Sequence, residues 1–274
     1  MRLYYLGPKG TFSYLASQKL ILENDIEYLA KSNLHEVIKA VSSDDNSIGI
    51  VPIENSIEGT INIVADALAE QKIYAHGEIH LDIDFALYGY PSDSLHDIKK
   101  VYSIAPAISQ TTNYIHQHQF LYDYTDSTIQ SLDKIAKGIG AIAPLGSGET
   151  YGYQPIDLHI QDYPHNVTRF LIVKNHTHFE DDTNTTMFLI TPQYDKPGLL
   201  ASVLNTFALF NINLSWIESR PLKTQLGMYR FFVQADTPVT NDVNKVITIL
   251  KTLDFTVNLI CLLYTSDAAD DLLC

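Results

Sequence analysis

Three short segments bring together hydroxyl, amide, carboxylate and guanidinium groups, a set that suits the binding of a small organic anion. They are residues 7–13 (GPKGTFS), 51–60 (VPIENSIEGT) and 166–170 (NVTRF). The first two should expose backbone N–H groups at helix N-termini, where the helix dipole favours carboxylates. The third places the hydroxyl of Thr168 beside the guanidinium of Arg169. All three are expected as loops at strand ends, where two-lobed α/β proteins bind their ligands.

Each segment also has an ordinary structural explanation. A Gly-Pro turn before a helix is usually only a turn, Glu54 and Asn55 can be capping groups, and Arg169 can form a structural ion pair. Taken singly, these explanations are preferable. The segments gain weight because they occur together and in this order.

The apolar pattern around the segments predicts alternating strands and helices. Strands are expected at residues 2–6, 47–52, 83–90, 101–104 and 139–143, and helices at residues 12–20, 61–68, 111–118 and 127–137. Thr60 is the expected N-cap of the second helix, and Ser127 or Thr128 that of the last. The alternation predicts an α/β layer with mostly parallel strands.

A second regular pattern follows the polar stretch at residues 174–184, which has the composition of a linker. Its elements are a strand, a helix, two strands, a helix and a strand at residues 185–191, 198–210, 213–220, 227–235, 242–250 and 255–260. This βαββαβ order is ferredoxin-like. Residues 261–274 show no turn signal, and we interpret them as an atypical tail, either a native extension or, preferably, foreign sequence from a frameshift or read-through.

The composition excludes several classes of function. The chain has 18 Lys and Arg against 32 Asp and Glu, and a formal net charge of −14, so no nucleic-acid partner is expected. An anionic substrate must be held by local groups at short range. No apolar run is long enough for a membrane span, so no membrane partner is expected. Both cysteines, Cys261 and Cys274, lie near the C-terminus, which argues against a disulfide framework and for a cytoplasmic protein.

Two patterns that hint at a cofactor or a metal have better structural explanations. Residues 138–143 (GIGAIA) fit a dinucleotide fingerprint by letter, but that motif follows a strand and opens a helix, whereas here the order is reversed. Gly138 is therefore an expected helix C-cap. The His-X-His pairs at residues 116–118 and 176–178 lack further metal ligands and are expected to be solvated. No metal and no cofactor are predicted.

Together the three segments resemble the signature motifs of the prephenate dehydratase family, over residues 1–178. The resemblance implies a catalytic domain of two periplasmic-binding-protein-like lobes with the active site in the cleft between them. It implies removal of water and CO2 from prephenate to give phenylpyruvate, without a cofactor. Because the ring becomes aromatic, the driving force lies in the substrate, and the enzyme must help hydroxide to leave.

The resemblance also assigns roles to individual residues. Thr168 is implied as the donor to the departing oxygen, acting as a positioned donor because a threonine is a weak acid. Asn55 and Glu54 would orient the ring hydroxyl or the nearby carboxylate, and Arg169 would stabilise carboxylate charge or anchor the loop. The substrate-binding residues implied are Gly10, Thr11, Ser56, Ser103, Gln110, Asn166 and Phe170. Residues 103–111 depart from the family pattern, and only Ser103 and Gln110 are carried over from it.

Residues 184–260 resemble an ACT domain, a small ligand-binding module. The match rests on residues 197–200 (PGLL) and 217–221 (IESRP). It implies feedback inhibition by L-phenylalanine bound across a subunit interface of a homodimer or homotetramer. The residues implied are Gly198, Leu199, Leu200, Glu218, Ser219, Arg220 and Pro221. Core packing alone would also explain the Gly-Leu-Leu sequence.

Two alternatives stay open on the sequence. An arogenate dehydratase would use the same fold on the aminated substrate. A non-catalytic amino-acid sensor could combine a two-lobed binding fold with an ACT domain. The intact Thr168-Arg169-Phe170 argues against the sensor, because binding alone does not need this hydroxyl.

Overall fold

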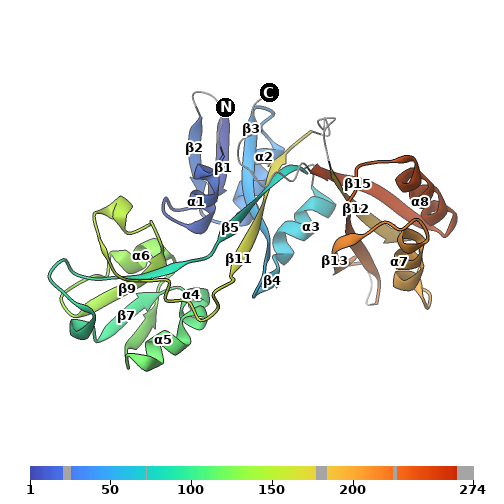
Figure 1. The fold of residues 1–274 in the computed structure, drawn as a ribbon. Helices are drawn as coiled ribbons and strands as arrows, with labels where there is room; N and C mark the ends of the chain where they lie inside the picture. Colours follow the sequence, from blue (N-terminus) through green and yellow to red (C-terminus); the bar gives the residue numbers. More distant parts are fainter. Residues whose placement is uncertain (21–25, 72, 177–183, 225–226, 264–274) are drawn as a thin grey trace.

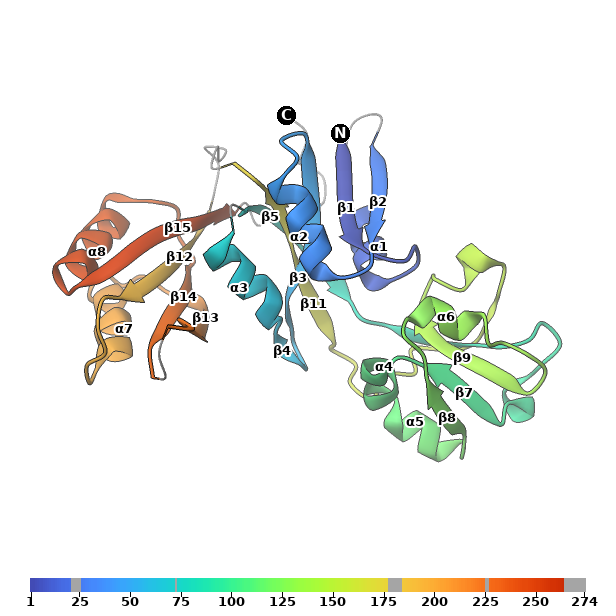
Figure 2. The same ribbon diagram turned by 180° about the vertical axis from the view of Figure 1, so that it is seen from behind.

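The computed structural model describes the chain except for residues 21–25, 72, 177–183, 225–226 and 264–274 and the side chains of residues 261–263. The described chain forms three parts in a row (Figure 1). Lobe one comprises residues 1–82 and 167–176, lobe two residues 83–166, and the C-terminal unit residues 184–263. Lobe one lies in the middle, as the view from behind also shows (Figure 2).

Lobe one carries the first strands and helices of the chain. Its elements are β1 (Arg2–Leu6), α1 (Phe12–Gln18), β2 (Glu27–Lys31), α2 (Leu34–Ser42), β3 (Ser47–Asn55), β4 (Gly59–Thr60), α3 (Asn62–Glu70), β5 (Tyr74–Asp82) and β11 (Val167–Lys174). β1 is parallel to β2 and β3, whereas β11 is antiparallel to its neighbours β3 and β5. β3 is buried over most of its length, as expected for a central strand with a continuous apolar sequence.

Lobe two has its own sheet, in the order β10-β6-β9-β7-β8. Its elements are β6 (Phe85–Tyr88), η1 (Leu95–Asp97), β7 (Lys100–Ser103), α4 (Ala105–Gln110), α5 (Thr112–Gln117), β8 (Leu121–Tyr124), α6 (Thr128–Leu132), β9 (Ile139–Pro144), η2 (Glu149–Tyr151) and β10 (Pro155–Leu158). Residues 83–84 lead from lobe one into lobe two, and residues 159–166 lead back (Figure 1). The predicted two-lobed α/β architecture is confirmed.

The C-terminal unit has the predicted βαββαβ order. Its elements are β12 (Thr185–Pro192), α7 (Leu199–Leu209), β13 (Leu214–Pro221), β14 (Tyr229–Ala235), α8 (Asn241–Thr252) and β15 (Phe255–Leu263). Phe188 and Phe231 of the sheet share a core with Val203 of α7 and Val246 of α8. Both helices therefore cover the same face of this sheet.

The other face of the C-terminal sheet packs on α3 of lobe one. Trp216 and Phe232 belong to one core with Val64 and Leu68 of α3, and Figure 1 shows α3 between the strands of lobe one and the C-terminal unit. Cys261 of β15 also pairs with Ala75 of β5. The strands of lobe one and the C-terminal unit thus form one ten-stranded sheet.

Several local expectations are corrected. Thr60 is not an N-cap, because it lies in β4 opposite Glu54 and α3 begins after Ile61 without a side-chain cap. Gly138 has a left-handed φ of 77° but is no helix C-cap, since α6 ends at Leu132. Ser127 does cap α6, accepting from the N–H of Gln130.

The boundaries of the C-terminal tail also change. Residues 261–263 continue β15 and pair with β12, so the sheet extends past the expected end of the domain at Ile260. Residues 264–274 lie outside the described part, as do residues 177–183 of the expected linker. In the part that is described, no helix is long and apolar enough to cross a membrane.

Ionic contacts extend the interface along α3. Asp66 and Glu70 lie one turn apart on this helix. Arg220 donates from Nε and Nη2 to the two carboxylate oxygens of Asp66, at 3.0 and 3.1 Å. Arg230 donates from Nη2 to Glu70 at 2.6 Å. Lys223 reaches both carboxylates, at 2.9 and 3.2 Å, so three cations of the C-terminal unit face two anions of α3.

Asp66→Asn should lower the free energy of unfolding at neutral pH by about 1–2 kcal/mol, because it removes the charged acceptor of Arg220. The hydrogen bond from Arg220 holds the pKa of Asp66 below its usual value of 3.8, although burial opposes this. A lowered pKa adds stability above the unfolded-state value, and that stability is lost as the pH falls through the folded-state value. Denaturant titrations should show a constant difference from about pH 5 to about pH 8 that shrinks below about pH 4.

Asp242→Asn is a matched control for this prediction. Its partner Lys245 and Asp242 itself are 61% and 53% exposed on α8, and exposed pairs contribute only about 0–1 kcal/mol. An Asp66→Asn effect no larger than the control, or one that persists undiminished in acid, would contradict the assignment.

Candidate active site

The end of β3 and the start of β11 bring Asn55 and Thr168 together. The two residues are paired in the antiparallel ladder, so their side chains project from the same face. Nδ2 of Asn55 donates to Oγ1 of Thr168 at 2.9 Å and to Oδ1 of Asn166 at 2.8 Å. The three side chains belong to residues that are 7%, 8% and 3% exposed. They form an enclosed polar cluster at the boundary of lobe one with lobe two.

The orientation of the Asn55 amide is fixed by the loop that follows it. Its Oδ1 accepts hydrogen bonds from the backbone N–H groups of Ile57 and Glu58, both at 2.9 Å. Nδ2 must then face Thr168, whose oxygen acts as an acceptor. Among the described residues, none accepts the proton of the Thr168 hydroxyl. This proton is available to a bound molecule.

Gln110, at the end of α4, joins the cluster from lobe two. Its Oε1 accepts from Nδ2 of Asn166 at 2.7 Å, and its Nε2 donates to Glu58 at 3.1 Å. Because Gln110 is 6% exposed and bonds Glu58 of lobe one, it closes the contact between the lobes. Glu58 was given no role from the sequence. Its place in the ENSIEGT segment, residues 54–60, could have identified it.

Ser56 joins the loop after β3 to the segment that leads into β11. Its Oγ accepts from the N–H of Val167 at 2.9 Å and donates to the carbonyl of His165 at 3.1 Å. The hydroxyl is thus occupied by backbone groups. In this structure Ser56 fixes the loop that presents Asn166.

The loop before α1 contacts lobe two. Gly10 has a φ of +93°, which residues with side chains rarely adopt, and a Cβ there would lie 2.8 Å from Ile129 of α6. Thr11 caps α1, with its hydroxyl donating to the carbonyl of Leu6 at 2.7 Å. At Gly10 and Thr11, only the backbone is therefore left to contact a ligand.

Arg169 and Glu54 are not brought to the cluster. Adjacent residues of a strand project to opposite faces, so Arg169 points away from Thr168. Its guanidinium pairs with Glu78 at 2.6 Å. Glu54 is the ladder partner of Arg169 and lies on that same far face. In this geometry neither side chain contacts a ligand bound at Thr168.

Phe170 and Ser103 are also corrected. Phe170 is 1% exposed and packs in the core that spans the two lobes, so it is a structural residue rather than a binding surface. Ser103 is fully buried, and its hydroxyl donates to the carbonyl of Ile142 at 2.6 Å. Its function is to join β7 to β9.

The histidine pairs differ from expectation in one respect. His116 is exposed, but His118 is half-buried and stacks on Phe120 with ring centroids 5.4 Å apart. His178 lies outside the described residues. Within the described ranges, no group of three or more His, Cys, Asp and Glu is placed to hold a metal ion.

The residues implied for L-phenylalanine fall on two faces of the C-terminal sheet. Gly198 has a φ of 84°, and a Cβ there would meet nothing within 4 Å. Ser219 pairs with Phe231 on the face that α7 and α8 cover. Arg220 projects to the opposite face, where it binds Asp66. Glu218 shares that face, because it pairs with Phe232.

Comparison with known proteins identifies the family of the chain. The sequence model of the prephenate dehydratase family matches residues 3–178, which include all the residues of the cluster. The chain belongs to the prephenate dehydratase family. As a member of this family it is an enzyme, a carbon–oxygen lyase.

Similar proteins cover almost the whole chain. Prephenate dehydratase of Methanocaldococcus jannaschii is 36% identical over 259 residues, 91% of this chain and 92% of the relative. The crystal structure of prephenate dehydratase from Staphylococcus aureus subsp. aureus Mu50 is 73% identical with a TM-score of 0.92, covering 96% of this chain and 100% of that one. The Arthrobacter aurescens prephenate dehydratase in complex with L-Phe is 29% identical with a TM-score of 0.86, covering 97% and 91%. Similarity therefore extends through the C-terminal unit.

Proposed function

We propose that this prephenate dehydratase converts prephenate to phenylpyruvate, with Thr168 as the donor to the leaving hydroxide. The observation that carries the proposal is the hydroxyl of Thr168, which accepts from Asn55 at 2.9 Å and keeps its own proton for a ligand. A buried donor that is already oriented stabilises charge as it develops in the transition state.

The bond changes require one proton and no redox partner. The bond from the ring to its carboxylate breaks, and the electron pair enters the ring as CO2 leaves. The ring C–O bond breaks, and the departing hydroxide takes a proton through the Thr168 hydroxyl and leaves as water. Thr168 regains a proton from solvent, while Asn55 stabilises the transient charge on Oγ1. No cofactor is needed, because formation of the aromatic ring supplies the driving force.

Substrate binding relies on neutral donors. The described cluster presents the amides of Asn55, Asn166 and Gln110 and the backbone at Gly10 and Thr11, while Ser56 holds their loop in place. Because Gln110 bonds Glu58 across the lobes, prephenate enters when this contact opens, and its carboxylates then take over the amide donors that the opening releases. Charge is held at short range despite the negative net charge of the protein.

The C-terminal unit is the regulatory ACT domain of this proposal, and its ligand is L-phenylalanine. Open space beside Gly198 lets a ligand approach the start of α7, where Leu199 and Leu200 offer apolar side chains. Ser219 and Pro221 lie on the face of the sheet that α7 and α8 cover, whereas Glu218 and Arg220 lie on the face toward α3, where Arg220 binds Asp66. The complex of the Arthrobacter aurescens relative with L-Phe supports this choice of effector.

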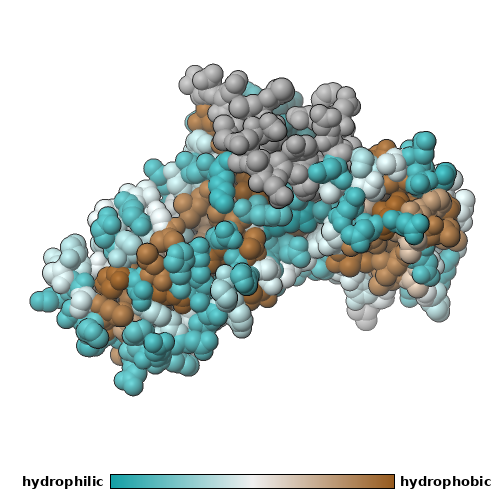
Figure 3. All heavy atoms as spheres, viewed as in Figure 1, coloured by the Kyte–Doolittle hydropathy of each residue, from teal (hydrophilic) through white to brown (hydrophobic). Residues whose placement is uncertain are grey.

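A second copy of the chain completes this regulatory site. In the described sheet, β13 is the outermost strand, and an unpaired edge can add a strand from a partner. Ile217 of β13 is 43% exposed, and Leu200 and Leu204 of α7 are 40% and 37% exposed. Hydrophobic residues reach the surface of this unit in Figure 3. We place the resulting dimer or tetramer in the cytoplasm.

One assay tests both activity and regulation. Purified protein incubated with prephenate should release phenylpyruvate, and L-phenylalanine should slow this release and shift the oligomer size measured by light scattering. D-phenylalanine serves as the control ligand, and arogenate as the alternative substrate. If the protein forms phenylalanine from arogenate and does not turn over prephenate, then arogenate is the substrate. An inert protein would end the proposal, and an unchanged rate and size with L-phenylalanine would end its regulatory part.

A further inference from the structure

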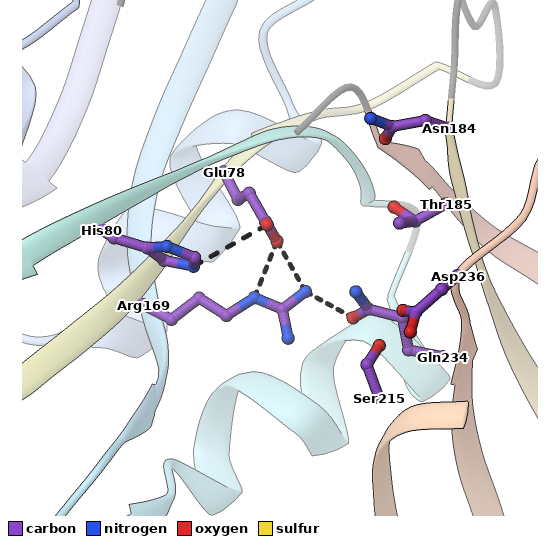
Figure 4. Close-up of a pocket in the computed structure, with 8 residues that line it drawn as sticks. All are labelled: Glu78, His80, Arg169, Asn184, Thr185, Ser215, Gln234 and Asp236. Atoms are coloured by element: carbon purple, nitrogen blue, oxygen red, sulfur yellow. Dashed lines mark hydrogen bonds and ion pairs between the residues drawn. The ribbon is translucent and has the colours of Figure 1, made fainter. Parts of the chain in front are cut away.

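Arg169 follows Thr168 in sequence but links lobe one to the C-terminal unit on the far face of β11. Its Nε donates to Oε2 of Glu78 at 2.7 Å, and Nη2 lies 2.6 Å from the same oxygen. Nη2 also donates to Oε1 of Gln234, on β14. Figure 4 shows the carboxamide of Gln234 reaching the guanidinium from the C-terminal unit.

These three groups form an enclosed and directional contact. Arg169 and Gln234 are 9% and 5% exposed, and the Glu78 side chain is 7% exposed. A planar guanidinium engaged at both Nε and Nη2 keeps little rotational freedom. The position of the Arg169 side chain is thus fixed by both parts of the molecule at once.

The backbone at this point needs such a restraint. The ladder between β11 and β3 changes register between Arg169 and Phe170, and bulges beside active sites re-aim the neighbouring side chains. Thr168 is the residue directly before this irregular step. A shift of the Arg169 side chain would therefore pass through one peptide unit to the Thr168 hydroxyl.

We propose that Arg169 is a positioning residue for the reaction, held by Glu78 within lobe one and by Gln234 from the C-terminal unit. The C-terminal unit thereby contributes one residue to the alignment of the Thr168 hydroxyl. This inference rests on the proposed role of Thr168. The contact adds a second polar connection between the C-terminal unit and lobe one, because Arg220 binds Asp66 of α3 and Gln234 binds Arg169 of β11.

A cavity beside the contact makes it adjustable. The three groups border a cavity of about 450 Å³ that is also lined by Ser215 and Asp236 (Figure 4). This space leaves room for the Gln234 side chain to turn away from the guanidinium.

Gln234→Leu tests the proposal, because it removes the acceptor and keeps a side chain of similar size. We expect kcat for prephenate to fall about tenfold, within the roughly 10²-fold that a 1 Å misplacement can cost. KM should stay within about twofold, since the variant touches no substrate-binding group. Gln234→Glu keeps the acceptor oxygen and should restore most of kcat. Ser215→Ala lines the same cavity without bonding Arg169, and should match the native enzyme.

A double-mutant cycle shows whether the two residues act as one unit. Arg169→Lys loses the fork that binds Glu78 and Gln234 together, so adding Gln234→Leu to it should cause little further loss of kcat. All rates are normalised to the folded fraction measured by circular dichroism. A native enzyme without activity would end the proposed function itself. An active native enzyme with an unchanged kcat in Gln234→Leu, losses that track unfolding, or fully additive losses would overturn this inference alone.

Discussion

Thr168→Ala should lower kcat for phenylpyruvate formation by about 10²- to 10⁴-fold, the range that a positioned proton donor contributes. The structural cost should be small, because Nδ2 of Asn55 keeps its bonds to Asn166 at 2.8 Å and to the carbonyl of Val167 at 3.3 Å. Steady-state kinetics with prephenate, together with thermal unfolding, separates the two effects. The expected signature is a large loss of kcat in a protein that remains folded.

Two further variants identify the hydroxyl as the cause. Thr168→Val has nearly the same shape without the hydroxyl and should be as slow as the alanine variant. Thr168→Ser retains the hydroxyl and should stay within about tenfold of the native rate, since only its side-chain restraint is lost. Full activity in the valine variant would remove Thr168 from the mechanism.

Asn55→Asp should reduce kcat by at least about 10²-fold and the free energy of unfolding by about 1–3 kcal/mol. The substitution places a carboxylate oxygen where Nδ2 now donates to Asn166 and Thr168. Two oxygen acceptors would then face each other at Asn166. The Thr168 proton would turn toward the new carboxylate and no longer toward the substrate.

Asn33→Asp makes the same chemical change away from the Thr168 cluster and serves as the control. Asn33 caps α2 by accepting from the N–H of Glu36 at 2.9 Å, and Asn and Asp cap helices about equally well. Kinetics and unfolding should therefore be unchanged in this control. Native rates in Asn55→Asp would show that the amide does not orient Thr168.

The sequence predicted the local elements of the fold better than the contacts between them. Continuous apolar runs identified β1, β3 and β9, and helical spacing identified α1, because these signals are local. The long strand β5 (Tyr74–Asp82) was missed, since its alternating sequence YAHGEIHLD carries two histidines and two acids. Its partner β11 supplies the pairing that makes it a strand.

Motif position located the site, but side-chain direction required the structure. Thr168 and Arg169 were assigned to one site because they are neighbours in sequence. Once residues 167–174 are recognised as a strand, its period of two already places them on opposite faces. Phe170 and Ser103 were assigned to substrate binding, but both are buried. Their burial depends on distant residues that the motifs do not contain.

The role of α3 could not be predicted from its own sequence. Its apolar residues suggested only that one side is buried, and its partners Trp216 and Phe232 come from more than a hundred residues later in the chain. The pairing of Asp66 with Arg220 has the same origin. Contacts between separate units leave no periodic signal.

The core that α3 shares with the C-terminal sheet bears on how freely the two modules can be exchanged. A catalytic fragment ending before β12 would leave Val64 and Leu68 without their partners Trp216 and Phe232, and exposed apolar patches promote aggregation. A transplanted regulatory module would need a matching apolar face and cations opposite Asp66 and Glu70. Each module therefore depends on the other to bury part of its apolar surface.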